Sequence, residues 1–396
     1  MSACAHDRPD NRDYFADFTR RAMAARVPLD GSIELTHRCN LRCVHCYLGD
    51  QEAIRGHRNE EMSTQEVKAL IDEVVAAGAL NLTFSGGDPM MRRDFSELYV
   101  YAVKKGLLIT IFCDGVLVSD RIVDVFKKYP PRMVEVSIYG ATRETYEGIT
   151  RVKGSFHRCL AGIERLHRNG QRFKLKSVLM SGNRHEIEGM RALAKSYGVD
   201  FYFDSAVFPC LPHGDNHGGA NRGADDTGGK TPASVEVAPP SLERPLALRV
   251  SPEEAAAAQL SDRTTARELA DLYVRTRNLP DNDRLYVCGA GQTTFHVDPY
   301  GNLQPCTIST NVDYNIREGG FLEGWNGPIA AIRDIRRSAD NSCRSCDKQA
   351  LCSGCPAMSF AEHGAGDRKS DYICRTTHAL FDGIEGTVRD ILETSP

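Results

Sequence analysis

Short apolar runs of β-strand composition alternate with helical patterns over the first half of this 396-residue chain. The six runs are Ser32–Thr36, Leu82–Ser85, Leu107–Phe112, Met133–Tyr139, Phe173–Met180 and Asp200–Phe208. Strands that alternate with helices form parallel sheets with right-handed crossovers. The pattern therefore predicts an α/β fold, either an open doubly wound sheet or a barrel. Both architectures bind ligands at the carboxyl ends of their strands.

Helical signals lie between these runs. Ser63-Thr-Gln-Glu66 is a capping box, and apolar residues follow it at helical spacing. Ser119 is a candidate N-cap for another helix. Further helical patterns cover Asp94–Lys105, Ser155–Asn169, Asn183–Tyr197 and the alanine-rich stretch Ser251–Asn278. The first three of these provide the crossovers that a parallel sheet requires.

The composition limits the class of protein. With 41% hydrophobic and 26% charged residues, the chain can build and solvate a core. A formal net charge of -4 gives no basic field, so nucleic acid is not an expected partner. No run approaches the roughly 20 apolar residues that cross a bilayer, and residues 1–30 lack the apolar segment of a secretory signal. We expect a cytoplasmic protein with no membrane partner.

Cysteine placement is the main clue to chemistry. Ten of the fourteen cysteines fall into spaced groups, and in a reducing compartment such groups bind metal more often than they form disulfides. Cys39, Cys43 and Cys46 follow the first predicted strand. Three thiolates on one loop can hold three irons of a four-iron cluster and leave the fourth iron open. Of the ungrouped cysteines, Cys113 and Cys159 are expected to be buried as small hydrophobes.

Seven grouped cysteines occupy the C-terminal third, namely Cys288, Cys306, Cys343, Cys346, Cys352, Cys355 and Cys374. The first two flank a predicted hairpin with a turn at Asp298–Asn302. Paired CxxC motifs are also typical of structural zinc. Two zinc sites would need eight ligands and seven cysteines are present, so iron–sulfur clusters are favoured.

The loop from Cys39 to Cys46 resembles the CxxxCxxC signature of the radical S-adenosylmethionine (SAM) enzymes. The resemblance implies a partial (βα)6 TIM-like barrel, a [4Fe-4S] cluster on these cysteines and SAM on the open iron. It also implies reductive cleavage of SAM to a 5′-deoxyadenosyl radical that abstracts hydrogen from a substrate.

The same resemblance assigns SAM-binding residues. Gly86-Gly87-Asp88-Pro89 is similar to the GGEP motif that contacts the SAM amino group, although Asp88 has a shorter reach than the usual Glu. Further residues are similar to family positions: Ser137 to a serine on the ribose, Arg151 to an arginine on the SAM carboxylate, and His45 to an aromatic ring beside adenine. Alternatively, the Gly-Gly pair forms an ordinary turn, Ser137 is a strand-end hydroxyl and Arg151 is a surface side chain.

The C-terminal cysteines resemble the SPASM domain, which usually holds two auxiliary [4Fe-4S] clusters. The resemblance assigns Cys343, Cys346, Cys352 and Cys374 to the second cluster, and Cys288, Cys306 and Cys355 to the first. Two residues separate Cys352 from Cys355 where three are usual. The first cluster then lacks one ligand, so Asp283 completes it, Cys210 reaches it, or its iron is open.

These assignments divide the chain into five segments. They are an N-terminal extension (1–30), the radical SAM barrel (31–209), a flexible Gly/Pro-rich insertion (210–245), a helical linker (246–284) and the SPASM domain (285–396). The insertion has few large apolar side chains and cannot offset its ordering entropy.

The leading functional expectation is a maturase that forms a thioether or carbon–carbon crosslink in a ribosomally made peptide. Its expected partners are a precursor peptide or protein, a flavodoxin- or ferredoxin-like electron donor, and a separate leader-recognition protein, since 30 residues are too few for such a domain. One alternative is a sulfatase-maturing, formylglycine-forming enzyme, but Thr307 stands where that subfamily has a catalytic aspartate. Another is a non-catalytic iron–sulfur electron-transfer protein, against which Gly86–Pro89 and Ser137 count.

Overall fold

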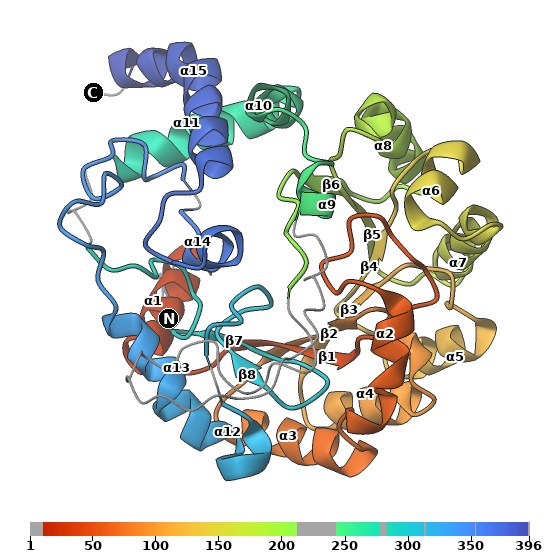
Figure 1. Cartoon of the computed structure of the whole chain (residues 1–396). Helices are drawn as coiled ribbons and strands as arrows, with labels where there is room; N and C mark the ends of the chain where they lie inside the picture. Colours follow the sequence, from red (N-terminus) through yellow and green to blue (C-terminus); the bar gives the residue numbers. More distant parts are fainter. Residues whose placement is uncertain (1–10, 212–242, 278–282, 313, 353, 395–396) are drawn as a thin grey trace, which may run out of the picture.

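A curved sheet with helices on its outer face dominates the computed structural model (Figure 1), which describes residues 11–211, 243–277, 283–312, 314–352 and 354–394. The strands are β1 (Asp30–Thr36), β2 (Asn81–Gly86), β3 (Leu108–Cys113), β4 (Met133–Ser137), β5 (Phe173–Val178), β6 (Phe201–Asp204), β7 (Thr294–Val297) and β8 (Leu303–Gln304). Most of the predicted insertion at 210–245 lies outside the described residues.

The eight strands have the order β6-β5-β4-β3-β2-β1-β7-β8. All neighbouring pairs from β6 to β1 are parallel, which confirms the predicted α/β fold with six strands in a parallel sheet. The predicted hairpin is formed by β7 and β8, which pair antiparallel. Because β7 also pairs in parallel with β1, the C-terminal region extends the same sheet.

The α-helices of the first half include α2 (Gln51–Gly56), α3 (Thr64–Ala76), α4 (Phe95–Lys104), α5 (Asp120–Lys128), α6 (Arg143–Thr150), α7 (Ser155–Arg168) and α8 (Ile187–Ser196). The capping box of α3 is confirmed: Ser63 Oγ accepts from Glu66 N at 3.2 Å, and Glu66 Oε2 accepts from Ser63 N at 2.7 Å. Ser119 caps α5 as predicted. Helices α3 to α8 line the outside of the sheet (Figure 1).

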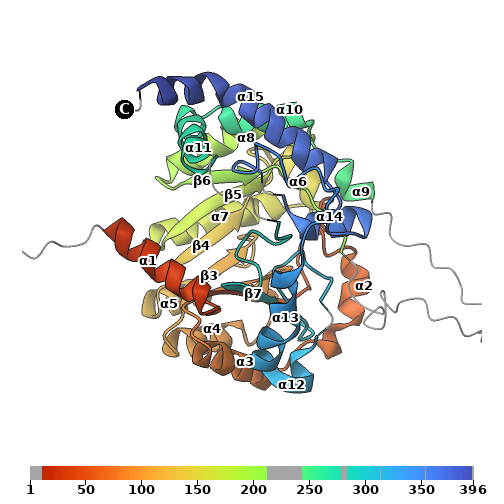
Figure 2. The ribbon, with the colours of Figure 1, turned by 90° about the vertical axis from the view of Figure 1, so that its left-hand side faces the viewer.

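The predicted helical stretch after Ser251 is two helices, because Asp262 caps a second one. The remaining α-helices are α1 (Asn11–Ala24), α9 (Glu243–Leu246), α10 (Pro252–Leu260), α11 (Arg263–Thr276), α12 (Ile316–Asn326), α13 (Pro328–Ala331), α14 (Pro356–His363) and α15 (Asp371–Thr394). Helices α11 and α15 share a small core of Ala270, Tyr273, Ile384, Val388 and Ile391. Helices α10, α11 and α15 therefore form a unit on the open side of the sheet (Figures 1 and 2).

The segment before β1 connects the barrel to the C-terminal region. Arg26 donates to the carbonyl oxygens of Gly291 at 3.1 Å and Trp325 at 2.9 Å, while Trp325 Nε1 donates to Arg26 O at 2.9 Å. The main core holds buried residues from the barrel and from both β7 and α12. Within the described ranges, no helix combines the length and apolar character that crossing a membrane requires.

Candidate active site

The turn after β2 packs against the segment that leads into the first cysteine. The N–H of Gly87 donates to Thr36 O at 2.9 Å, and the N–H of Asp88 donates to Arg38 O at 3.1 Å. A Cβ atom on Gly86 would lie 2.0 Å from Thr36 O, and Gly86 has a φ of +126°. Glycine is required here because the two backbones touch. The Gly-Gly pair thereby fixes the start of the cysteine loop.

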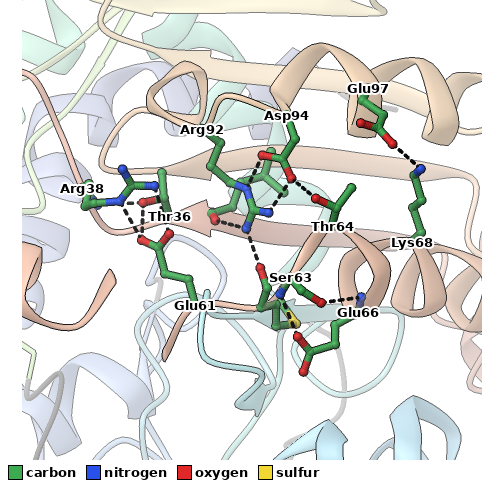
Figure 3. Close-up of polar contacts among 12 residues, drawn as sticks. Thr36, Arg38, Glu61, Ser63, Thr64, Glu66, Lys68, Arg92, Asp94 and Glu97 are labelled. Atoms are coloured by element: carbon green, nitrogen blue, oxygen red, sulfur yellow. Dashed lines mark hydrogen bonds and ion pairs between the residues drawn. The ribbon is translucent and has the colours of Figure 1, made fainter. Parts of the chain in front are cut away.

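Ion pairs also support the segment that leads into the cysteine loop (Figure 3). Arg38 donates two hydrogen bonds to Glu61, at 3.1 and 3.0 Å. The buried Arg92 pairs with Asp94 at 2.6 Å and donates to the carbonyl oxygens of Leu35 and Met62. These contacts join the end of β1, the turn after Pro89 and the start of α3. The cysteine loop thus rests on a framework made by Arg38, Glu61, Arg92 and Asp94.

A cavity of about 500 Å³ opens at the carboxyl ends of the strands. It is lined by seven of the residues predicted to bind SAM or the N-terminal cluster, namely Cys39, Cys43, Cys46, His45, Gly86, Gly87 and Ser137. Burial raises the pKa of the Cys46 thiol to about 11, and it also raises the pKa of the Cys43 thiol well above its usual range. Iron bound there must displace thiol protons.

His45 and Ser137 both contact the side chain of Tyr139. The His45 ring lies edge-on to Tyr139, with 4.5 Å between ring centroids, and burial lowers the His45 pKa to about 4. The neutral ring leaves a buried Nδ1 atom that has no hydrogen-bond partner among the described residues. Asn40 Oδ1, beside Cys39, is also buried without a partner in this part of the structure. Unpaired buried polar atoms of this kind suit a site built for a bound group.

Asp88 is placed differently from the other predicted SAM residues. Its side chain is fully buried and is absent from the cavity lining. Oδ1 accepts from Met90 N at 2.9 Å, and Oδ2 accepts from Asp114 N at 3.0 Å. Burial and the nearby Asp114 carboxylate raise the pKa of Asp88 well above its usual range. Pro89, also buried, begins the short 3₁₀ turn Pro89–Met91.

Arg151 lines a second cavity, of about 1060 Å³, which shares Cys43 and Cys46 with the first. Its backbone is left-handed, with φ at +57°, where it ends α6. Such a conformation is uncommon outside glycine. Cys210 lines the same second cavity, and its Sγ lies 3.8 Å from Cys46 O.

The cysteines assigned to the second auxiliary cluster surround a small cavity of about 80 Å³. Its lining includes Cys343, Cys346, Cys352, Cys374 and also Cys355. Burial raises the pKa of Cys343, nearby Arg337 lowers it, and the Cys352, Cys374 and Cys346 thiols raise it further. These thiols are therefore near neighbours despite up to 31 positions of sequence between them, from 343 to 374.

The cysteines assigned to the first auxiliary cluster also lie together. Burial raises the pKa of Cys306 to about 11, and the nearby thiols of Cys355 and Cys288 also raise it. Two candidates for the missing ligand have other contacts. Asp283 pairs with Arg336 at 2.7 Å, and Cys210 lies beside Cys46 on the other loop.

All of these donors are thiols, the ligands that iron–sulfur clusters require, so the residues fit such clusters. No group of three or more His, Cys, Asp or Glu side chains in the described ranges is placed to bind a single metal ion.

Sequence reasoning missed several polar side chains of the 500 Å³ cavity, among them Tyr47, Asp114 and Lys176. Tyr47 donates to the buried Glu34 at 2.6 Å. Burial lowers the pKa of Lys176 to about 8, while its neighbour Glu135, 3.3 Å away, opposes this shift. The available signal for Asp114 was its place two residues after the predicted strand Leu107–Phe112 and directly before a glycine.

Comparisons with known proteins bear on both halves of the chain. The family model described as the radical SAM superfamily matches residues 33–194, and the iron-sulfur cluster-binding domain SPASM matches residues 288–356. An AdoMet-dependent heme synthase from Methanosarcina barkeri is 29% identical over 361 residues, covering 88% of this chain and 95% of the relative. A PqqA peptide cyclase from Xanthomonas euvesicatoria is 26% identical over 376 residues, covering 94% and 89%.

A solved structure has a similar fold. Streptococcus suis SuiB bound to the precursor peptide SuiA gives a TM-score of 0.64 at 15% identity, over 94% of this chain and 83% of that chain. With the two matched domains and their cysteines in place, the chain is a radical SAM enzyme that carries a C-terminal SPASM domain.

Proposed function

We propose that this enzyme modifies a peptide, forming a thioether or carbon–carbon crosslink. One observation carries the proposal: Thr307 and Ile308, which directly follow Cys306, line the same cavity as Cys39, Cys43 and Cys46. A substrate in this cavity is therefore within reach of both the N-terminal cysteine loop and the first auxiliary cysteine group. Placing reactants side by side in this way removes much of the entropic barrier to reaction.

Cys39, Cys43 and Cys46 would hold the cluster, with SAM bound across Gly86, Gly87 and Ser137. A cluster held there would supply the electron for reductive cleavage of SAM, which is the chemistry that allows hydrogen abstraction from the substrate. The chain's own part is to orient the substrate and exclude water. Apolar side chains of the cavity, among them Leu41, Leu48, Phe112, Val207 and Phe208, suit the second task.

Cys288, Cys306 and Cys355 provide three thiols for the first auxiliary cluster, and the two proposed fourth ligands contact other groups. An open position would accept a thiolate from the substrate. A cysteine-containing peptide is the substrate class that uses such a position, which favours thioether formation.

The second cavity gives room for an extended chain beside the first. Its lining includes two positively charged side chains, Arg42 and Arg151, and two negatively charged ones, Asp50 and Glu144. A peptide backbone and mixed side chains suit this surface. The PqqA peptide cyclase and the SuiB complex with SuiA support a peptide substrate. A flavodoxin- or ferredoxin-like donor and a separate leader-recognition protein belong to the same proposal.

A heme precursor is the second candidate substrate. The match to the heme synthase from Methanosarcina barkeri covers 95% of that protein, so the similarity extends through both domains. Formylglycine formation is less well supported, because Thr307 brings a hydroxyl rather than a carboxylate base to the cavity.

Incubation with each substrate separately distinguishes a peptide-modifying enzyme from one that acts on a heme precursor. The anaerobically reconstituted enzyme is incubated with SAM and reductant, together with either a cysteine-containing precursor peptide or an iron porphyrin that represents a heme precursor. We expect the peptide alone to stimulate 5′-deoxyadenosine formation and to lose two mass units, as one crosslink removes two hydrogens. Stimulation by the porphyrin, with an unchanged peptide mass, would favour the second candidate and contradict the first.

A further inference from the structure

The cavity shared by Cys39, Cys43 and Cys46 has a sparse set of charged side chains. Among its described lining residues, Asp114 is the one carboxylate and Lys176 the one primary amine. SAM carries an amino group whose N–H bonds need an acceptor when they leave water. The residue type that supplies the strongest such acceptor is a carboxylate.

The aspartate of the Gly86–Pro89 motif is poorly placed for this role. Both Asp88 oxygens accept backbone N–H groups, from Met90 and from Asp114. The side chain is fully buried beneath the turn, and it does not line the cavity. The missing methylene, relative to glutamate, leaves the Asp88 carboxylate as an internal cap of the turn.

Asp114 lies at the carboxyl end of β3, next to the cysteine loop. Oδ1 accepts from Val116 N at 2.8 Å, and Oδ2 accepts from Asn40 Nδ2 at 2.6 Å. Oδ2 also lies 4.0 Å from Cys39 Sγ, so this oxygen sits where the cluster loop and the cavity meet. Each carboxylate oxygen has a second lone-pair direction, which leaves capacity to accept from a ligand.

We propose that Asp114 accepts the hydrogen bond from the amino group of SAM, and that Asp88 acts as a positioning residue. Asp88 Oδ2 accepts a hydrogen bond from the backbone N–H of Asp114 at 3.0 Å. This hydrogen bond fixes the backbone of Asp114 and so orients the Asp114 carboxylate at the cavity wall. Asp114 thus accepts the hydrogen bond and Asp88 positions it, where the family motif has a single glutamate. This inference rests on SAM binding in the cavity and is independent of the substrate proposed above.

The test is SAM binding to the anaerobically reconstituted enzyme without any peptide, measured by equilibrium dialysis. Asp114→Asn should weaken SAM binding roughly 10- to 100-fold, the range for losing a hydrogen bond to a charged group. Asp88→Glu should not tighten binding, and it should not rescue the Asp114→Asn variant. A wild-type dissociation constant for Asp114→Asn, or tighter SAM binding by Asp88→Glu, would overturn the proposal.

Two further measurements separate a SAM contact from damage to the cluster loop. Iron content and the electron paramagnetic resonance (EPR) signal of the reduced cluster without SAM should be the same in Asp114→Asn and wild type. If Asp114→Asn loses iron, Asp114→Ser provides a second variant for the same comparison. A signal that is already altered without SAM in both variants would place Asp114 with the cluster and contradict the proposal.

Discussion

The two ends of the chain hold their cysteines in different ways. Cys39, Cys43 and Cys46 follow a central strand, and the hydrogen bonds of Gly87 and Asp88 fix the entry to their loop. The cysteines from Cys343 to Cys355 lie in turns between α13 and α14, and the described residues of this stretch form no strand or long helix. The fold therefore positions the first group, whereas we expect the loops of the second group to depend more on bound metal for their order.

The largest expected effect is at the N-terminal loop. Cys43→Ala should leave too few thiols for the cluster and should eliminate the SAM-sensitive EPR signal, while the other eight irons of an expected total of about twelve remain. Iron analysis with EPR measures both quantities. Cys159→Ala, at a buried cysteine away from the cavity, is the control. Loss of all irons from Cys43→Ala would contradict the expectation that the N-terminal loop and the C-terminal cysteines bind iron independently.

A change at the other region should separate SAM cleavage from product formation. Cys306→Ala should still form 5′-deoxyadenosine without substrate, because the SAM cavity keeps its own three cysteines. It should form no crosslinked product, as judged by mass spectrometry. Cys210→Ala is the matched control and should keep the full iron content, since Cys210 lies beside Cys46 and not beside Cys306. Intact crosslinking by Cys306→Ala would refute a role for this cysteine.

Removal of iron should follow the same division. An external chelator should first take iron from the C-terminal groups, since Cys288 is exposed while Cys39 is buried and rests on the framework. Far-ultraviolet circular dichroism, recorded during chelation, should change before the SAM-sensitive EPR signal is lost. The reverse order would show that metal, and not the fold, also orders the N-terminal loop.

The framework under the N-terminal loop should contribute measurably to stability. Arg92→Met removes the donor to two buried carbonyl oxygens and leaves Asp94 without its ion-pair partner, at a cost of about 3 kcal/mol in the free energy of unfolding. Urea denaturation measures this cost. Lys68→Met, which breaks the exposed pair with Glu97 (Figure 3), should cost less than about 1 kcal/mol. Equal costs would contradict a framework role.

The stabilisation from the ion pair between Arg92 and Asp94 should depend on pH. Burial opposes charge on Asp94, but hydrogen bonds from Arg92 and Thr64 lower its pKa to about 2 from an ordinary value of 3.8. The stabilisation is therefore present above about pH 4 and is lost as the pH falls through 2. Between these values wild type should lose about 1 kcal/mol more than Asp94→Asn, after allowance for partial exposure. Parallel stability curves would contradict the shifted pKa.

Local rules predicted much of the barrel. The strand runs and the Ser63 capping box act over a few residues, so their signals survive in the sequence. Helix α6, which carries Thr142 as its N-cap, was missed because its apolar positions are few. The extension of the sheet by β7 was also missed, since pairing of Asp30 with Thr294 depends on distant chain segments.

The site shows the same limit. The cysteine spacing predicted the N-terminal loop, and the structure brings its thiols to one cavity with Ser137 and His45. Motif similarity also pointed to Asp88, but a motif does not reveal which atoms its side chain contacts. The role of Asp114 depends on the backbone hydrogen bond that joins it to Asp88 across 26 positions.

Quantification of 5′-deoxyadenosine in a mixture of reconstituted wild-type enzyme, SAM and reductant tests the central claim most directly. The site geometry predicts 5′-deoxyadenosine from wild type and none from Cys43→Ala at equal protein concentration. A wild-type enzyme with its full iron content that forms no 5′-deoxyadenosine, with or without substrate, would contradict the claim.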